Sequence, residues 1–238
     1  MDRFAQAARL NNQGVAALLE GDDKAAVAAL TQSINIMKQE LSNVTEDNDT
    51  TKSAPFSSDD CENSSTTVEL PGFHVTQDSY IFADAINIPE HGDQTVVDLQ
   101  IYSAAVIFNL ALAVHREGNT SGNASSMAKA QKLYLMVLEV LNDQYMNSRV
   151  AVIVKLAAIN NLSQIRFDCG EYELAREGLA HLSTFMRTSD NTSDAMLEEP
   201  KIQDLLVNVL LLKAPVIAPA AWLVAISCSA IIEDIDRD

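Results

Sequence analysis

The sequence predicts an all-α fold of about three helix–turn–helix units, and two observations carry this prediction. The chain has 238 residues, of which 47% are apolar and only 5% aromatic, with few glycines and prolines. Such a composition favours closely packed helices around one core. The second observation is an internal repeat of alanine, asparagine and glycine. We therefore expect one helical domain over residues 1–238, with a long insert at 43–97.

The repeat is an alanine, an asparagine four residues later and a glycine nine residues after the asparagine. In this composition roughly a tenth of one such match is expected by chance, so three matches indicate a real internal repeat. The three sets are Ala8, Asn12 and Gly21; Ala105, Asn109 and Gly118; and Ala157, Asn161 and Gly170.

The first helix of each unit is predicted from residues that recur at i, i+3, i+4 and i+7, which form one face of a helix. The third residue of each set is small and would let a neighbouring helix approach closely. The sets are Leu10, Gln13, Gly14 and Ala17; Ile107, Leu110, Ala111 and Val114; and Ile159, Leu162, Ser163 and Arg166.

The glycines at 21, 118 and 170 are expected to end these helices, because glycine tolerates the left-handed conformation of a helix terminus. A second amphipathic helix then begins in each unit. Its predicted core residues are Ala26, Leu30 and Ile34 in the first unit, Ala130, Tyr134 and Val137 in the second, and Ala175, Leu179 and Leu182 in the third.

Two stretches, "NNQGVAALLEGDDKAAVAALTQSI" and "NNLSQIRFDCGEYELAREGLAHL", resemble the tetratricopeptide repeat (TPR). The resemblance covers roughly 130 residues in three units. It implies a right-handed α-superhelix of about three helix pairs followed by C-terminal helices. It also implies that the first helix of each pair lines a concave groove.

The repeated asparagines lie two residues after an apolar packing position, about 200° around the helix, so they face away from that stripe. The resemblance therefore places Asn12, Asn109 and Asn161 in the groove, with Ala8, Ala105 and Ala157 on the same side. Such amides could bind the backbone of an extended peptide, since each offers two donors and an acceptor. The alternative is that each asparagine bonds to a neighbouring helix.

We interpret the chain as a scaffold or adaptor that binds a protein or peptide in this groove. The alternative is an enzyme or enzyme accessory subunit that uses the groove for a small molecule. We expect no catalytic, cofactor or metal site, because the four histidines form no i, i+4 pair and Cys169 is expected to be a buried structural thiol. A carboxylate clamp for chaperone tails is excluded, since only Asn109 matches its pattern.

The net charge of −17 disfavours nucleic acid and anionic membranes as partners. The opening residues form an amphipathic pattern without the apolar core of a signal peptide. Three cysteines without a CxxC motif favour a reducing compartment. We therefore expect a cytoplasmic protein, with the nucleus as an alternative and a membrane tail anchor as a less favoured one.

The acidic insert has two parts with different compositions. Twenty of the 27 residues from Asn43 to Glu69 are Ser, Thr, Asn, Asp or Glu, which predicts disorder. Residues 79–89 are apolar, β-branched and aromatic, and we expect them to lie extended against the helices. They would either occupy the groove beside Asn12 and Asn109 as an internal ligand, or seal a gap elsewhere.

The C-terminal part is apolar from Leu205 to Ile232, with Pro215 and Pro219 inside it. The prolines leave too short a helix to span a membrane. We therefore expect a capping helix at about 199–212 and a last helix packed on the core. The alternative is an exposed surface that contacts a partner subunit.

Overall fold

The computed structural model of the chain describes residues 3–46, 81–90, 95–141, 145 and 148–188. Its six helices are α1 (Arg3–Glu20), α2 (Asp23–Glu46), α3 (Val96–Ser121), α4 (Ala124–Val140), α5 (Arg149–Asp168) and α6 (Tyr172–Thr188). The described residues contain no strand, so the prediction of an all-α fold is confirmed for this part of the chain.

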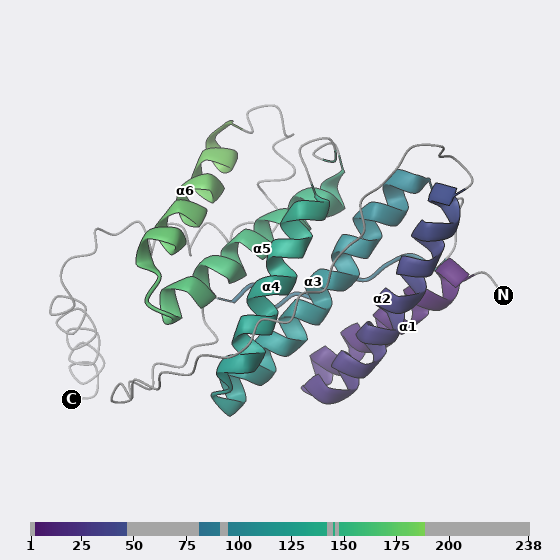
Figure 1. The fold of residues 1–238 in the computed structure, drawn as a ribbon, viewed down its shortest axis with the longest axis horizontal. Coiled ribbons are helices and arrows are strands. Elements are labelled where there is room, and N and C mark those ends of the chain that lie inside the picture. The colour runs from purple at the N-terminus through teal and green to yellow at the C-terminus, as the bar shows by residue number, and fades with distance from the viewer. Residues whose placement is uncertain (1–2, 47–80, 91–94, 142–144, 146–147, 189–238) are drawn as a thin grey trace, which may run out of the picture.

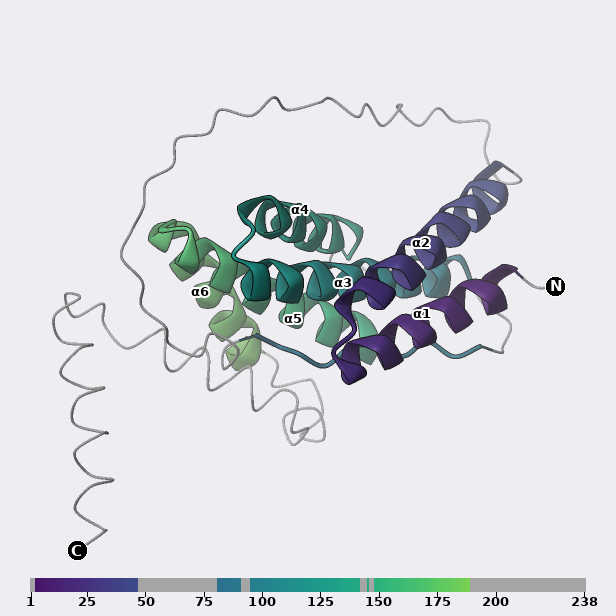
Figure 2. The same cartoon turned by 90° about the horizontal axis from the view of Figure 1, so that it is seen from below.

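The helices pack in consecutive pairs, α1 on α2, α3 on α4 and α5 on α6, and they follow one another in chain order across the molecule (Figure 1). The first helices of the pairs also contact one another, since α3 touches both α1 and α5. Figure 2 shows residues 81–90 crossing α5, α3 and α1 on the side opposite α2 and α4. The first helices therefore form an inner layer that carries this segment.

The core runs through all three pairs as one continuous cluster. The predicted core residues of α4 and α6 are all buried, and so are Ala26 and Leu30 of α2, with Ile34 half-buried. In the predicted stripe of α1, by contrast, Gln13 is exposed. The buried face of α1 instead includes Phe4, Ala7, Asn11 and Leu18.

Two of the three predicted turn glycines end their helices as expected. Gly21 and Gly170 both have φ of +79°. After each of them, the next N–H bonds five residues back, Asp22 to the Ala17 carbonyl at 2.9 Å and Glu171 to the Arg166 carbonyl at 2.8 Å. This is the hydrogen bonding of a Schellman motif, in which the glycine satisfies the last carbonyls of the helix.

The prediction for the third glycine is wrong, because Gly118 lies inside α3 and the helix ends at Gly122, with φ of +63°. The Asn123 N–H bonds to the Gly118 carbonyl, so the same turn occurs four residues later. Four residues are about one turn of helix. The inserted residues therefore lengthen α3 by one turn and leave its buried face in phase with the other units.

Gly118 has a different role at the crossing of α3 and α4. A Cβ atom placed on it would lie 2.8 Å from the Met127 sulfur and 3.2 Å from the Met127 backbone nitrogen. Similar close approaches occur between Gly14 and Leu30 and between Gly178 and Ser163. Small residues at these crossings let each helix pair pack tightly, as the sequence predicts for positions 14 and 163.

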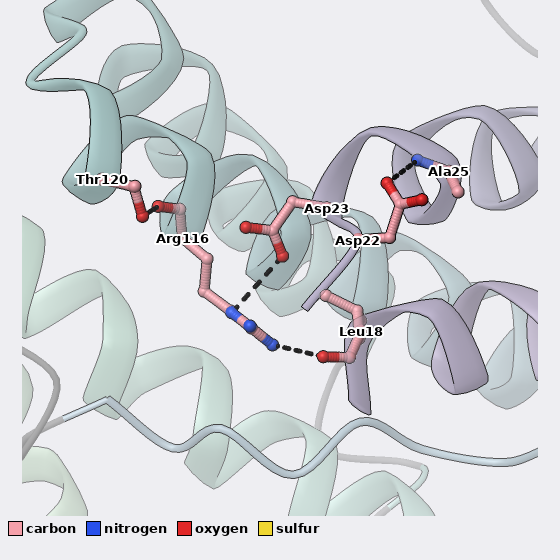
Figure 3. A network of polar contacts seen from close by, with 6 residues as sticks. All are labelled: Leu18, Asp22, Asp23, Ala25, Arg116 and Thr120. Atoms are coloured by element: carbon pink, nitrogen blue, oxygen red, sulfur yellow. Dashed lines mark hydrogen bonds and ion pairs between the residues drawn. The ribbon is translucent and has the colours of Figure 1, made fainter. Parts of the chain in front are cut away.

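An arginine joins the second pair to the first (Figure 3). The Arg116 guanidinium on α3 donates a hydrogen bond to the Leu18 carbonyl at 2.8 Å, and its Nε lies 3.4 Å from an Asp23 carboxylate oxygen. Burial raises the pKa of Asp23, and the nearby Arg116 charge opposes that rise. The contact fixes the α1–α2 turn against α3.

Several predictions concern residues outside the described part of the chain. These are most of the acidic stretch, Tyr80, the capping helix at about 199–212 and the apolar C-terminus. The expected disorder from Asn43 is wrong at its start, since α2 continues to Glu46. Within the described part, α3 and α5 are long and apolar enough to cross a membrane, and 72% of each apolar stretch is buried inside the fold.

Candidate functional site

Three asparagine side chains hold the backbone of residues 81–90, and they are the three that the repeat singles out. The carbonyl oxygen of each amide accepts the N–H of one residue, and its NH2 group donates to the carbonyl of that same residue. The pairs are Asn161 with Phe82 (2.8 and 3.1 Å), Asn109 with Ile86 (2.8 and 2.8 Å) and Asn12 with Ile88 (2.9 and 2.9 Å).

This pairing requires an extended segment. In a strand, the N–H and C=O of one residue point to the same side and bond to one partner residue, and the next residue points to the other side. Phe82, Ile86 and Ile88 are separated by even numbers of residues, so all three can face the helices together. Each asparagine therefore replaces the backbone of a neighbouring strand.

Two further asparagines, for which the sequence predicts no role, bond to the first three. Asn11 donates to the Ile86 carbonyl at 2.9 Å and accepts from the Asn109 amide at 2.8 Å. Asn160 donates to the Asn161 carbonyl oxygen at 3.1 Å. The signal was present as the repeated "NN" at 11–12 and 160–161.

Asn109 and Asn161 each bond both to the extended segment and to another helix. Asn109 on α3 bonds both to Ile86 and to Asn11 on α1. Asn161 on α5 bonds to Phe82 and also donates to the Tyr134 hydroxyl on α4 at 3.1 Å. Bonds between helices therefore orient the same amides that bind the extended backbone. We call the amides of Asn12, Asn109 and Asn161, together with Asn11 and Asn160, the asparagine ladder.

The ladder lies within the core. Asn11, Asn109 and Asn161 are fully buried, Asn160 is 2% exposed, and Asn12 is half-buried. A buried amide without partners destabilises a fold, whereas a fully bonded one fixes a single arrangement. The predicted groove alanines, Ala8, Ala105 and Ala157, are fully buried one helical turn before the asparagines.

An aromatic pocket receives the first anchored side chain. Phe82 meets Phe108 edge-on with ring centroids 6.2 Å apart, and Phe108 packs in turn on Tyr134. His115 completes the group, with its Nδ1 atom 3.4 Å from the Tyr134 hydroxyl. Because Tyr134 accepts a hydrogen bond from Asn161, its own proton is free to point to His115.

Burial controls the ionisation of this pocket. It lowers the pKa of His115 to about 4, because the charged imidazolium would lose its hydration. Burial also raises the pKa of Tyr134 above its ordinary range, against the opposing hydrogen bond from Asn161. Both groups are therefore neutral at pH 7. The apolar ring of Phe82 therefore lies in a pocket whose His115 and Tyr134 side chains carry no charge.

Possible metal ligands and one cysteine, Cys169, lie among the described residues. No three His, Cys, Asp or Glu side chains in the described ranges lie close enough to hold a metal ion. Cys169 is exposed at the end of α5, which corrects the expectation of a buried thiol. Partial burial raises its pKa, and the Glu171 and Asp168 carboxylates act in the same direction. A raised pKa leaves less of the nucleophilic thiolate.

Another hollow, of about 640 Å³, lies between α4, α5 and α6. Its lining is mostly apolar, with Leu135, Leu156, Leu162 and Leu174 on its walls. The chain continues beyond α6 into residues that the structure does not describe, which include the predicted capping helix. The ladder differs from this hollow because it has defined hydrogen-bond partners, in a segment that lies on the side opposite α2 and α4 (Figure 2).

Comparisons of the chain with protein-family models, with curated proteins and with solved structures give no match. The geometry of the ladder and of the segment that it holds is therefore what indicates a function.

Proposed function

We propose that the protein is a scaffold or adaptor that binds an extended segment of another protein in the groove formed by α1, α3 and α5. The observation that carries this proposal is the set of three paired hydrogen bonds between asparagine amides and the backbone of Phe82, Ile86 and Ile88. Each pair recognises main chain, which any protein can present.

The architecture supports the same function. Three consecutive helix pairs, each with its first helix in one layer, are what the resemblance to TPR proteins implies, and we propose a TPR-like right-handed superhelix for the whole chain. In such a superhelix the first helices line the concave surface. The ladder belongs to α1, α3 and α5, the first helices of the three pairs.

The ladder is suited to binding because bonds to other helix side chains orient its amides. Asn109 is bonded to Asn11, and Asn161 to Tyr134 and Asn160, in addition to their bonds to the segment. A side chain that is fixed before binding loses little conformational entropy when its ligand arrives. The segment 81–90 now occupies the site, so an outside peptide must replace it.

The experiment is a peptide-library selection on an open variant, which is the full chain with Phe82→Ser and Ile88→Ser. These changes remove two apolar anchors and keep the backbone groups. Circular dichroism should show that the variant remains helical. We expect the library to yield peptides whose affinity falls at least about tenfold when Asn109→Ala or Asn161→Ala is added, because each truncation leaves backbone groups unpaired.

The matched control is Asn35→Ala, at an exposed asparagine on α2. It should leave the affinity of the selected peptides unchanged. Failure to recover peptides on a folded open variant would contradict the proposal, as would peptides that bind equally well without Asn109 and Asn161.

A further inference from the structure

The resident segment indicates which side chains the groove accepts. Phe82 is 5% exposed and Ile88 is 2% exposed, and Ile86 packs half-buried on the same core. Asp84 and Asn87, between them, are exposed. Burying a large apolar side chain is strongly favourable, whereas an exposed side chain contributes little to the affinity of the segment for the groove. The groove therefore requires large apolar side chains mainly at the first, fifth and seventh residues of the sequence Phe82–Ile88.

The backbone requirement falls on the same three residues. Phe82, Ile86 and Ile88 each use both their N–H and their C=O in a ladder pair. A proline at any of these positions would lack the donor. The proline of the described segment, Pro89, comes directly after the last paired residue. The two buried apolar side chains of the segment, Phe82 and Ile88, belong to residues whose backbone is bound, and so does the half-buried Ile86. Ile81 and Ala85 are also half-buried against the core, without a ladder pair.

The segment also has a direction. From its N-terminal end it meets α5, then α3, then α1, opposite to the order of these helices in the chain (Figure 2). An amide pair alone does not distinguish the two directions of a strand. The aromatic pocket does, because Phe108 receives the ring of Phe82 at one end, whereas a branched aliphatic side chain is buried at the other.

We propose that the groove selects an extended peptide with an aromatic residue followed by large aliphatic residues four and six positions later, each with a free backbone N–H, and that residues 81–90 are a resident copy of this ligand. The inference rests on the proposed function and adds the sequence class of the partner. A partner segment would bind in the same direction and would displace the resident one.

The resident segment is a strong competitor because it is covalently attached nearby. Only four residues separate Glu90 from Thr95, the residue that caps α3. Such a connection reaches at most about 18 Å when fully extended. A tethered ligand of this kind has an effective concentration on the order of millimolar. A partner that lacks any of the three anchors would not displace it, so the tether increases selectivity.

The experiment measures binding of a fluorescent peptide of residues 79–90 to the open variant and to the unaltered full chain by anisotropy. We expect the open variant to bind at least about tenfold more tightly, because its own segment competes poorly. Three altered peptides then test the pattern. One exchanges Phe82 with Asp84, one carries an N-methyl group on Ile86, and one carries an N-methyl group on Asn87.

The exchange keeps composition and moves the ring by two residues, so affinity should fall at least about tenfold. N-methylation of Ile86 removes one ladder bond and should reduce affinity by about tenfold or more. N-methylation of Asn87, whose N–H points away from the ladder in an extended chain, should change affinity by less than about threefold. Equal binding of the native and exchanged peptides would overturn the proposed pattern.

The failures of the two proposals can be distinguished. Library peptides that depend on Asn109 but follow another pattern would leave the proposed function standing and refute this inference. If the open variant does not fold, protease sites placed within 62–68 and 91–94 of the otherwise unaltered chain release the resident segment by cleavage. The labelled peptide should then replace it with the same ranking of competitors, and a different ranking would refute the pattern.

Discussion

Asn109 and Ile86 form a closed pair of hydrogen bonds, 2.8 Å long in both directions, between the middle of α3 and the middle of the extended segment. The second hydrogen of the same amide is donated to Asn11 on α1. One fully buried side chain thus links two helix pairs and the segment.

Replacing this side chain should therefore destabilise the whole fold. Asn109→Ala leaves the N–H and C=O of Ile86 and the Asn11 oxygen with fewer partners, and each buried unsatisfied group costs about 1–3 kcal/mol. We expect the free energy of unfolding to fall by at least about 2 kcal/mol in urea denaturation. The exposed Asn35→Ala control should change it by less than about 0.5 kcal/mol. A neutral Asn109→Ala would mean that the amide is not bonded as described.

The buried histidine should give the protein a defined pH dependence. The pKa of His115 is lowered to about 4 in the folded chain, against 6.5 as the ordinary value. Between these pH values the unfolded chain binds the extra proton and the folded chain does not. Stability should therefore fall as the pH falls from 6.5 to 4, by about 3 kcal/mol in total from this residue.

The His115→Leu variant isolates this effect. Its stability should lack the His115 contribution, so the difference between the two proteins should grow steadily in favour of the variant from pH 6.5 to pH 4. The Asp168 carboxyl, whose pKa is raised by burial, changes stability with pH in the opposite direction. It is present in both proteins, so it does not affect the difference between them. Parallel pH profiles would show that His115 is not buried in its neutral form.

The crossing of α5 and α6 offers a pair of compensating substitutions. A Cβ atom at Gly178 would lie 2.3 Å from Ser163 Oγ, and its next neighbour is 3.6 Å away. Gly178→Ala should therefore cost about 1–3 kcal/mol through overpacking. Adding Ser163→Ala removes the clashing oxygen and should restore stability to within about 0.5 kcal/mol of the parent. Thermal melts of the two single variants and the double variant measure the coupling between the two positions. If the stability changes of the single variants simply add in the double variant, Gly178 and Ser163 do not approach each other as described.

The turn at Gly170 should depend on backbone conformation alone. Its φ is +79°, and no atom lies within 4 Å of a Cβ built there. Gly170→Val should cost about 1–3 kcal/mol, because a β-branched residue is strained in the left-handed region. Gly170→Asn should cost less, since asparagine adopts this conformation more readily. If both variants lose the same stability in denaturant melts, the cost of replacing Gly170 does not come from its positive φ.

The sequence was sufficient for the helices and for most of the turns. Amphipathic periodicity and the repeated spacing are local properties, and they predict Gly21 and Gly170 correctly. They fail at Gly118 because a glycine is compatible with both a helix interior and a helix end. The four added residues preserve helical phase, so the periodicity of α3 does not reveal the extra turn.

The ladder could be predicted only in part. Spacing placed Asn12, Asn109 and Asn161 on one side of their helices. The apolar stretch 79–89 was one candidate ligand for Asn12 and Asn109, but the sequence could not decide between this role and the sealing of a gap elsewhere. The partners of the three asparagines are 76, 23 and 79 residues away along the chain. Contacts this distant leave no periodic signal in one sequence. The aromatic pocket was missed for a related reason, because Phe108 and Tyr134 carry the same pattern as any core residue.

The central claim is that asparagine amides, and not general burial, hold the extended segment. Residue-resolved amide hydrogen exchange on the full chain tests this most directly, because the ladder pairs alternate residues of one strand. We expect slow exchange at Phe82, Ile86 and Ile88, fast exchange at Ala83 and Asn87, and loss of protection at Ile86 in Asn109→Ala. Uniform exchange across 81–90, or protection at Ile86 that survives Asn109→Ala, would contradict the central claim.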